Sequence, residues 1–218
     1  MPRFSELAAA PDATLDMLAL ALAAEFHEVD ADGAIAELDA LGTELRRTAD
    51  DTDRTPEAIA GACTRTLGVV HGFLGDRATY DHPDNSMLDR VLTRRRGLPI
   101  LLSVVYVEVA RRAGIRLAPV GLPGHFVVAH FGTASPVVLD PFAGGGRITP
   151  EVAPALMRPW TAHEVTMRIL NNLVATYDRR GDLGAAIRAA AMRLALPSGI
   201  DAHERLATEL RAQQARLN

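Results

Sequence analysis

Apolar residues recur at helical spacing through the first part of the chain. Between residues 12 and 47 they form two runs separated by Asp30-Ala31-Asp32-Gly33, a sequence that favours a turn. Pro56 suits the first turn of a third helix, which the spacing extends to about Val70. Residues 1–83 are therefore predicted to form a helical N-terminal part. The two earlier runs consist of Leu15, Leu18, Leu22 and Phe26, and of Ile35, Leu38, Leu41 and Leu45.

A short helix followed by a buried one is predicted next. Ser86 and Asp89 have the spacing of a capping box in which Asp replaces Glu or Gln, and Gly97 would end this first helix. Pro99 then suits the first position of a helix that runs to about Ala113. Apolar residues occupy nearly the whole circumference of this second helix, which is typical of a helix buried at the centre of a domain.

Two strands are predicted after a Pro- and Gly-rich link from Val120 to Gly124. They are His125–Phe131 and Val137–Phe142, each a short apolar run of the strand type. Successive positions in both runs are apolar, so both faces of their sheet should be covered. Gly144-Gly145-Gly146 follows, and because no Lys-Ser/Thr pair comes after it, we interpret these glycines as a turn and not as a phosphate-binding loop.

The rest of the chain is predicted to be helical. Thr149-Pro150-Glu151 has the pattern of a helix start, and the spacing from Met167 onward is helical again. Part of it, residues 168–186, looks like one tetratricopeptide repeat, which would pack on the main domain because a lone repeat cannot stack. These patterns divide the remaining chain into a core over residues 84–150 and a helical tail over residues 151–218.

Composition narrows the class of protein without changing this outline. Of 218 residues, 48% are hydrophobic and 23% are charged, with a net charge of -4, which is typical of a globular protein and gives no reason to expect nucleic acid as a partner. The chain has no lysine, so Schiff-base catalysis, a pyridoxal-phosphate lysine and a Walker-type phosphate loop are excluded. No cofactor is expected. The first apolar run, Leu15 to Ala24, is too short to span a membrane, and no membrane partner is expected either.

Cys63 is the only cysteine of the chain. An intramolecular disulfide and a thiolate zinc cluster are therefore both excluded. A single cysteine fits a reducing compartment, and we expect a cytoplasmic protein. The residue falls on one helical face with Ile59 and Leu67, which favours packing in the core over the role of a nucleophile.

His125 and Asp140 are polar residues in otherwise apolar strands, where an unpartnered buried polar group costs about 1–3 kcal/mol. The length of the loop between the strands decides whether they meet. A two-residue turn at Gly132-Thr133 would set them directly opposite each other, and a four-residue loop would leave them diagonal on one face. A five-residue loop would put them on opposite faces. A carboxylate beside an imidazole fixes the tautomer and raises the basicity of the ring, as a Cys-His-Asp acyl-transfer site requires.

Four short runs of the core form a combined motif, namely Asn85-Ser86-Met87-Leu88, Arg95-Arg96-Gly97-Leu98-Pro99-Ile100, Gly121-Leu122-Pro123-Gly124-His125-Phe126 and Asp140-Pro141-Phe142. Together they resemble the SirB-type bacterial transglutaminase-like family. The resemblance covers most of the chain, because the helical start, the core and the tetratricopeptide-like tail follow the order of that family. It implies an α+β fold of the papain-like, transglutaminase-like type, with a central buried helix packed on an antiparallel sheet and helical N- and C-terminal extensions.

The resemblance also implies a catalytic site, which this chain has only in part. His125 and Asp140 match the histidine and aspartate of active relatives. The cysteine of those relatives would fall at the start of the central helix, near Pro99 or Ile100, where this sequence has no nucleophile. We expect a transglutaminase-like protein that lacks its usual catalytic residue.

Two functions are compatible with that expectation. The leading hypothesis is a non-catalytic module that binds a peptide, a protein or a small molecule in the cleft beside the His-Asp pair. The alternative is an amide hydrolase or acyltransferase that uses Ser103 or Cys63 as a substitute nucleophile, although core packing is favoured for both residues. The candidate ligand contacts are Asn85, Arg95, Arg96, Pro123 and Gly124.

Simpler interpretations exist for several of these residues. Asn85 and Ser86 would equally serve as helix caps, and Arg94-Arg95-Arg96 as a solvated helix end that the helix dipole favours. A metal site built from His125, His130 and Asp140 is disfavoured because strand parity puts the two histidines on opposite faces. A purely helical interaction protein would rest on the tail alone, and a single repeat offers little concave surface.

Overall fold

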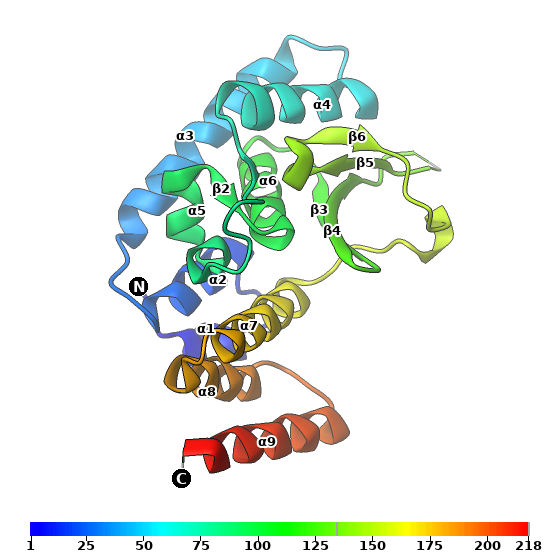
Figure 1. Cartoon of the computed structure of the whole chain (residues 1–218). Coiled ribbons are helices and arrows are strands. Elements are labelled where there is room, and N and C mark those ends of the chain that lie inside the picture. Colours follow the sequence, from blue (N-terminus) through cyan, green and yellow to red (C-terminus); the bar gives the residue numbers. More distant parts are fainter. Residues whose placement is uncertain (134, 218) are drawn as a thin grey trace.

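The computed structural model describes residues 1–133 and 135–217. Its N-terminal part is helical, as predicted, and α3 lies along one side of the molecule (Figure 1). The predicted third helix has the expected extent, although its second half is a π-helix, η1. An additional short helix, α1, precedes the predicted ones. The elements are α1 (Phe4–Ala9), α2 (Leu15–Ala24), α3 (Ala31–Asp50), α4 (Pro56–Cys63) and η1 (Thr64–Val70).

The turn predicted at Asp30 to Gly33 is the start of α3 instead. The Asp30 side chain accepts a hydrogen bond of 2.9 Å from the backbone N–H of Gly33 and so caps the helix. Asp is favoured at this position because it satisfies one of the free N–H groups of the first turn. The turn between the two helices lies before Asp30, at residues 25–27.

The helix predicted from Ser86 to Gly97 is shorter at both ends. Ser86 belongs to the 3-10 turn η2 (Pro83–Ser86), and the helix α5 spans Leu88–Arg94, so the predicted capping box does not form. Arg95 ends α5 by adopting the left-handed conformation with φ +55°. Gly97 lies beyond the helix, in a two-residue strand, β2 (Arg96–Gly97), that pairs in parallel with β1 (Leu74–Gly75).

The central helix, α6 (Pro99–Arg112), has the extent and the burial that the sequence predicts. Leu101, Leu102 and Val105 are fully buried, as is most of the remaining circumference. The helix packs against α3 and α5 and, on its other side, against the first two strands of the main sheet (Figure 1). The predicted α+β architecture, a central buried helix on an antiparallel sheet, is confirmed.

The main sheet is fully antiparallel, and its four strands follow chain order. Val127, Ala129 and Val138 are buried on the face turned away from α6, where Met157 helps to cover them. Both faces of the sheet are therefore covered, as predicted. The strands are β3 (Leu117–Leu122), β4 (His125–His130), β5 (Val137–Asp140) and β6 (Gly146–Ile148).

The link predicted from Val120 to Gly124 is wrong, because most of it belongs to β3. Pro119 and Gly121 hide the strand in the sequence, since both residue types are unfavourable in strand interiors. Pro119 is tolerated because β3 is an edge strand with one neighbour. Gly121 is accommodated for a different reason: the Trp160 ring lies where a Cβ would be. Only Pro123 and Gly124 form the turn, and Gly124 has φ +71°.

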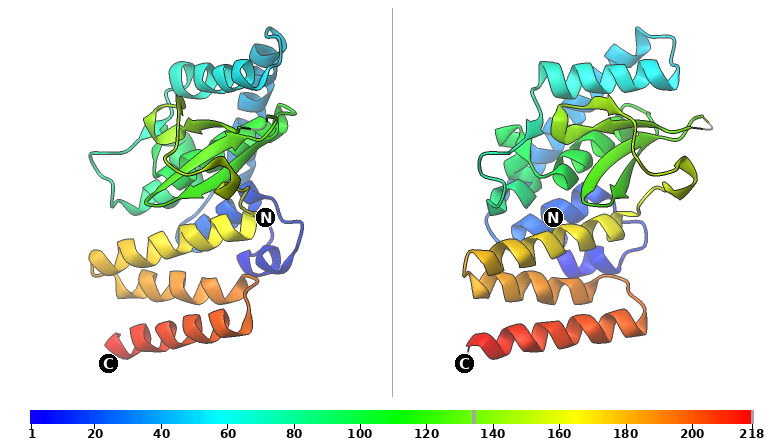
Figure 2. Two further views of the ribbon diagram at one scale, coloured as in Figure 1. Left: turned by 90° about the vertical axis from the view of Figure 1, so that its right-hand side faces the viewer. Right: turned by 45° about the vertical axis from the view of Figure 1, so that its right-hand side comes forward.

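The tail is helical later than predicted. The segment from Thr149 contains only the 3-10 turn η4 (Pro154–Leu156), and α7 begins at Ala162 behind a capping box of Thr161 and Glu164. Proline at positions 150, 154 and 159 keeps the intervening chain from forming a longer helix. Three helices then stack in succession below the core (Figure 2). They are α7 (Ala162–Arg179), α8 (Leu183–Met192) and α9 (Ile200–Gln214), with the 3-10 turns η5 (Arg193–Ala195) and η6 (Ala215–Leu217).

One hydrophobic core joins the N-terminal helices, the sheet and the tail. Leu20 of α2, Leu102 of α6 and Leu173 of α7 all belong to it. None of the helices in the described part of the chain is long and apolar enough to cross a membrane.

Candidate functional site

His125 and Asp140 meet at one end of the main sheet. The register pairs Val128 with Leu139 and His130 with Val137, so the loop between the strands holds an even number of residues, 131–136. Continued along β4, this register makes His125 and Asp140 diagonal neighbours on one face. Their side chains close the gap, and His125 Nε2 lies 3.0 Å from Asp140 Oδ2. Of the three arrangements that the sequence leaves open, the structure has the diagonal one, because the loop is longer than a two-residue turn.

The contacts of Asp140 fix the orientation of the pair. Its other oxygen, Oδ1, accepts a hydrogen bond of 2.9 Å from the backbone N–H of Phe142, so the carboxylate is held at both oxygens. Because Nε2 of His125 faces the carboxylate, Nδ1 is left as the nitrogen that can act on a reacting group. An imidazole held in this way is positioned as a general base. The side chains are 31% exposed for His125 and 15% for Asp140, so the ring can be reached from outside.

Aromatic rings form one wall beside the pair. Phe142 lies edge-on to His125, with ring centroids 6.5 Å apart, and edge-on to Tyr80 at 6.0 Å. The guanidinium of Arg77 covers the Phe142 ring at 5.1 Å. Gly75 lets this ring pack closely, since a Cβ there would overlap it.

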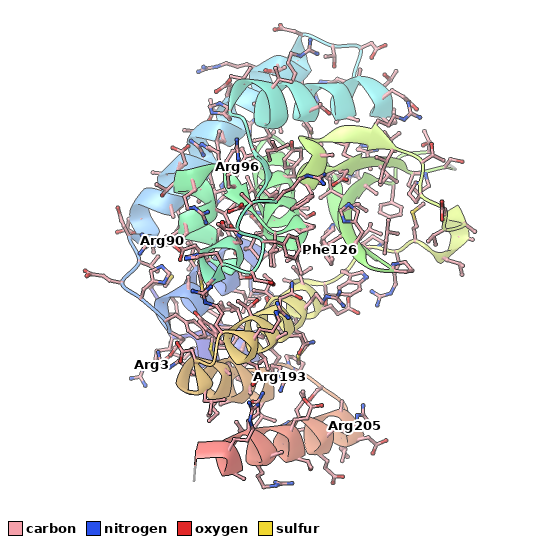
Figure 3. The ribbon with its side chains drawn as sticks, viewed as in Figure 1. Arg3, Arg90, Arg96, Phe126, Arg193 and Arg205 are labelled. Carbon is pink, nitrogen blue, oxygen red and sulfur yellow. The ribbon has the colours of Figure 1, made fainter. Side chains whose placement is uncertain are left out.

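A small pocket of about 60 Å³ opens beside His125, and it is where a nucleophile would have to stand. The first turn of α6 forms part of its wall through Pro99 and Ile100, opposite His125 and Phe126. The Phe126 ring, labelled in Figure 3, contacts Trp160 edge-on at 5.3 Å between centroids. The histidine, the aspartate and the helix start are thus assembled as in a Cys-His-Asp site, but neither side chain at the helix start is a thiol or a hydroxyl.

The two candidate substitutes lie elsewhere. Cys63 is fully buried in the hydrophobic core, and burial raises the pKa of its thiol to about 12. A thiol in that state is almost entirely protonated and inert at neutral pH. Ser103 is also fully buried, and its hydroxyl has no hydrogen-bond partner in residues 1–133 and 135–217. Neither side chain lines the pocket beside His125.

Asn85 lies under the site without opening onto it. It is fully buried, and its amide nitrogen donates to the carbonyl oxygens of Thr79 at 2.7 Å and Tyr80 at 3.3 Å. Its amide oxygen accepts from Arg94 at 3.0 Å. These bonds hold the loop that carries Tyr80 against α5, so Asn85 positions a wall of the pocket.

The three consecutive arginines are used within the fold and do not form a solvated helix end. Arg94 makes an ion pair of 2.8 Å with Asp76, whose side chain is 8% exposed. Arg95 pairs with Glu37 and stacks on Phe73, with its guanidinium 4.7 Å from the ring centroid.

Arg96 is likewise used within the fold, because it donates to the carbonyl oxygen of Gly72 at 2.7 Å. Figure 3 shows it well apart from Phe126. Arg95 and Arg96 do not line the pocket beside His125, and of the Pro123-Gly124 turn only Gly124 does.

Three residues of this pocket escape the sequence reasoning. Tyr80 comes from the loop before η2, and Arg168 and Asn172 come from α7 in the tail. Arg168 and Asn172 are four positions apart, which places them on one face of a helix, but nothing in the sequence says which surface that face meets. Both residues also line neighbouring hollows that are larger than this pocket: Arg168 lines one of about 710 Å³ beside Trp160, and Asn172 lines one of about 220 Å³ beside Arg179.

No metal site accompanies the pair. In the ranges 1–133 and 135–217, no three His, Cys, Asp or Glu side chains gather closely enough to hold an ion. His130 lies at the far end of β4, where its Nδ1 accepts a hydrogen bond from Gly132.

The amino-acid sequence of this chain is similar to those of several known proteins. The family model described as the transglutaminase-like superfamily matches residues 32–178. A UPF0162 protein of Xylella fastidiosa strain 9a5c is 34% identical over 168 residues, which cover 76% of this chain and 59% of that protein. A UPF0162 protein of the Temecula1 strain is 32% identical over 198 residues, which cover 81% of this chain and 70% of that protein.

A more distant similarity reaches animal proteins. F-box only protein 21 of Mus musculus is 31% identical over 126 residues, which cover 50% of this chain and 20% of that protein. No solved structure matches significantly.

Proposed function

We propose, from the premise that this chain belongs to the transglutaminase-like superfamily and to its UPF0162 members, that it is a non-catalytic binding protein. The cleft beside His125 and Asp140 would bind a peptide, a protein segment or a small molecule without forming an acyl-enzyme. The observation that carries this proposal is the first turn of α6, where Pro99 and Ile100 line the pocket in the place of a nucleophile.

The surroundings of the pocket support binding. The exposed Arg168 and the half-buried Asn172 of α7 line the pocket together with Tyr80, so charge, amide and aromatic groups meet at one small opening. The lining of this opening is more polar than apolar, so a ligand there would be held mainly by hydrogen bonds and charge. The imidazole of His125, held by Asp140, adds one more group that can accept or donate a hydrogen bond.

The test is to treat the folded protein with serine- and thiol-directed electrophiles and to locate adducts by mass spectrometry. We expect no adduct at Ser103 or Cys63, because both side chains are buried. The same reagents applied in denaturant should alkylate Cys63, which is the positive control. Labelling of either residue in the folded protein, or hydrolysis of an amide substrate that His125→Ala abolishes, would show an active enzyme and defeat the proposal.

We further propose that the tail is a docking accessory and that the chain is of the SirB type. The packing of α7 on α8 and the contribution of α7 to the pocket support this role for a tetratricopeptide-like unit. Because α7 also packs on α2, removal of residues 167–218 should leave an unstable core, which gel filtration and circular dichroism would detect. A folded, soluble core after this deletion would favour an independent module.

We infer a cytoplasmic location from the single, unpaired cysteine.

A further inference from the structure

A second, larger pocket of about 710 Å³ lies at the other end of β4 from the His-Asp pair. It is enclosed by the C-terminal part of α6, the start of β3 and the end of β4. Along a strand, the five residue-to-residue steps from His125 to His130 span about 16 Å. The two pockets have no lining residue in common.

The walls of this second pocket are mainly apolar. Ile115 and Leu117 contribute side chains that are otherwise buried in the core, at 8% and 7% exposure, and Val107 of α6 is half-buried beside them. Phe131 forms a rim and is 36% exposed. A volume of this size suits a small organic molecule with an apolar body.

The charged groups at the pocket are basic. Arg111, Arg116 and His130 line it, and none of the lining residues from the described ranges is acidic. The charge of Arg111 is offset by its ion pairs with Glu108 and Asp16. Arg116 is exposed and makes no ion pair within residues 1–133 and 135–217, so its guanidinium is available to a ligand.

His130 is arranged as a hydrogen-bond donor. Its Nδ1 accepts a hydrogen bond of 3.1 Å from the backbone N–H of Gly132, so the proton of the neutral ring is on Nε2. Burial, and after it the charge of Arg116, lower the pKa of His130 against the smaller opposing effect of Glu57, which favours the neutral ring at physiological pH. The ring then offers one N–H without adding a second full charge beside Arg116.

We propose that this pocket binds a small organic anion with an apolar body, of the class of medium-chain or aromatic carboxylates. Its carboxylate would bind Arg116 and the Nε2–H of His130, and its hydrocarbon part would pack against Ile115, Leu117 and Phe131. Guanidinium groups suit this role because they donate two parallel hydrogen bonds to a carboxylate. The site is separate from the cleft at His125 and does not depend on the function proposed for that cleft.

Three probes separate the contributions of charge and of apolar contact. Octanoate carries both, octanamide carries the chain without the charge, and acetate carries the charge without the chain. We expect calorimetry on the full chain to give octanoate about tenfold tighter binding than octanamide, the usual worth of a charge-assisted hydrogen bond, and no measurable heat with acetate. In methyl NMR spectra, octanoate should shift the signals of Ile115 and Leu117.

Arg116→Gln should remove the preference for octanoate and leave octanamide binding unchanged. Arg147→Gln is the matched control, because Arg147 is exposed on β6 and does not line the pocket. Circular dichroism should show that both variants fold. Absence of octanoate binding at millimolar concentration, equal binding of octanoate and octanamide to the unaltered protein, wild-type binding by Arg116→Gln, or methyl shifts confined to other regions would each overturn the proposal.

Discussion

Asp76 is a buried carboxylate whose hydrogen-bond partners hold a loop in place. It accepts hydrogen bonds from the backbone N–H of Thr79 at 2.9 Å and from the Thr79 hydroxyl at 2.6 Å, and it forms an ion pair with Arg94. The segment held in this way leads to Tyr80 at the pocket. Ionised Asp76 is therefore part of what shapes the site.

These partners predict how stability depends on pH. Burial alone would raise the pKa of Asp76, but the hydrogen bonds from Thr79, Arg94 and Asn85 outweigh it and hold this pKa at about 2. The pKa of an Asp in the unfolded chain is about 3.9. The contribution of Asp76 to stability is therefore complete above that pH and is lost as the pH falls toward about 2.

Asp76→Asn should therefore be less stable than the unaltered protein at pH 7 and should lose less stability between about pH 4 and pH 2. Urea unfolding at pH 7 and at several pH values between about 4 and 2 measures both effects. Asp201→Asn, on the exposed helix α9, should keep the wild-type pH dependence. An equally steep acid loss in Asp76→Asn would contradict this role of Asp76.

For single residues, the sequence predicts the candidate site residues better than it predicts their contacts in the fold. His125 and Asp140 are recognisable as polar residues in apolar strands, and the parity of the loop limits how they can meet. Asn85 is recognised as well, but its partners, Thr79 and Tyr80 in one loop and Arg94 on α5, become known only from the structure. Arg168 and Asn172 could not be assigned to the pocket, because only the packing of α7 brings them there.

Secondary-structure elements depend on close backbone contacts that spacing does not reveal. The π-helix η1 packs against the turn that precedes β6, and a Cβ at Gly68 would overlap the carbonyl oxygen of Gly144. The Thr64 hydroxyl donates to the carbonyl oxygen of Gly145 across the same contact. The strand β3 is hard to predict for a similar reason, because its Gly121 is required by the close contact with the Trp160 ring, and glycine is not typical of a strand. By contrast α6, where spacing and burial agree, is predictable.

A pair of glycines tests this close contact. Gly68→Ala should lower the free energy of unfolding by about 1–3 kcal/mol or more, because two backbone segments must separate to admit the methyl group. Gly61→Ala, in α4 with open space around it, should instead raise the free energy of unfolding by about 0.5–1 kcal/mol through higher helix propensity. Chemical denaturation of both variants measures the difference. Equal effects of the two substitutions would show that η1 does not press on this turn.

Across the whole molecule, stability is expected to fall from the core toward the C-terminal helix. The helix α6 is buried nearly all round, whereas α9 has no buried residue in the described part of the chain. Arg193 provides a polar link, since it contacts Asn171 of α7 and Glu209 of α9, each at 3.1 Å, and Figure 3 shows it between α8 and α9. In the tail, α7 is therefore held by its packing in the core, whereas α9 is weakly attached.

Hydrogen exchange should reveal this gradient. Amides of α9 should exchange by local opening, faster by several orders of magnitude than those of α6, which open only when the protein unfolds globally. Exchange followed by mass spectrometry resolves the two helices. Equal protection of α9 and α6 would show that α9 is covered in solution by contacts that this chain alone does not provide.

His125 and Asp140 lie beside a helix start that has no thiol or hydroxyl, and adding a thiol there tests the proposed site most directly. Cysteine should be placed at the start of α6 in Pro99→Cys and in Ile100→Cys, each with and without His125→Ala. The pH dependence of iodoacetamide alkylation gives the pKa of the new thiol. We predict that at least one variant has a thiol pKa about one unit or more below the usual value near 8.5, through His125 and the helix start, and that His125→Ala removes this decrease. Ordinary thiol pKa values in both variants, unchanged by His125→Ala, would contradict the account.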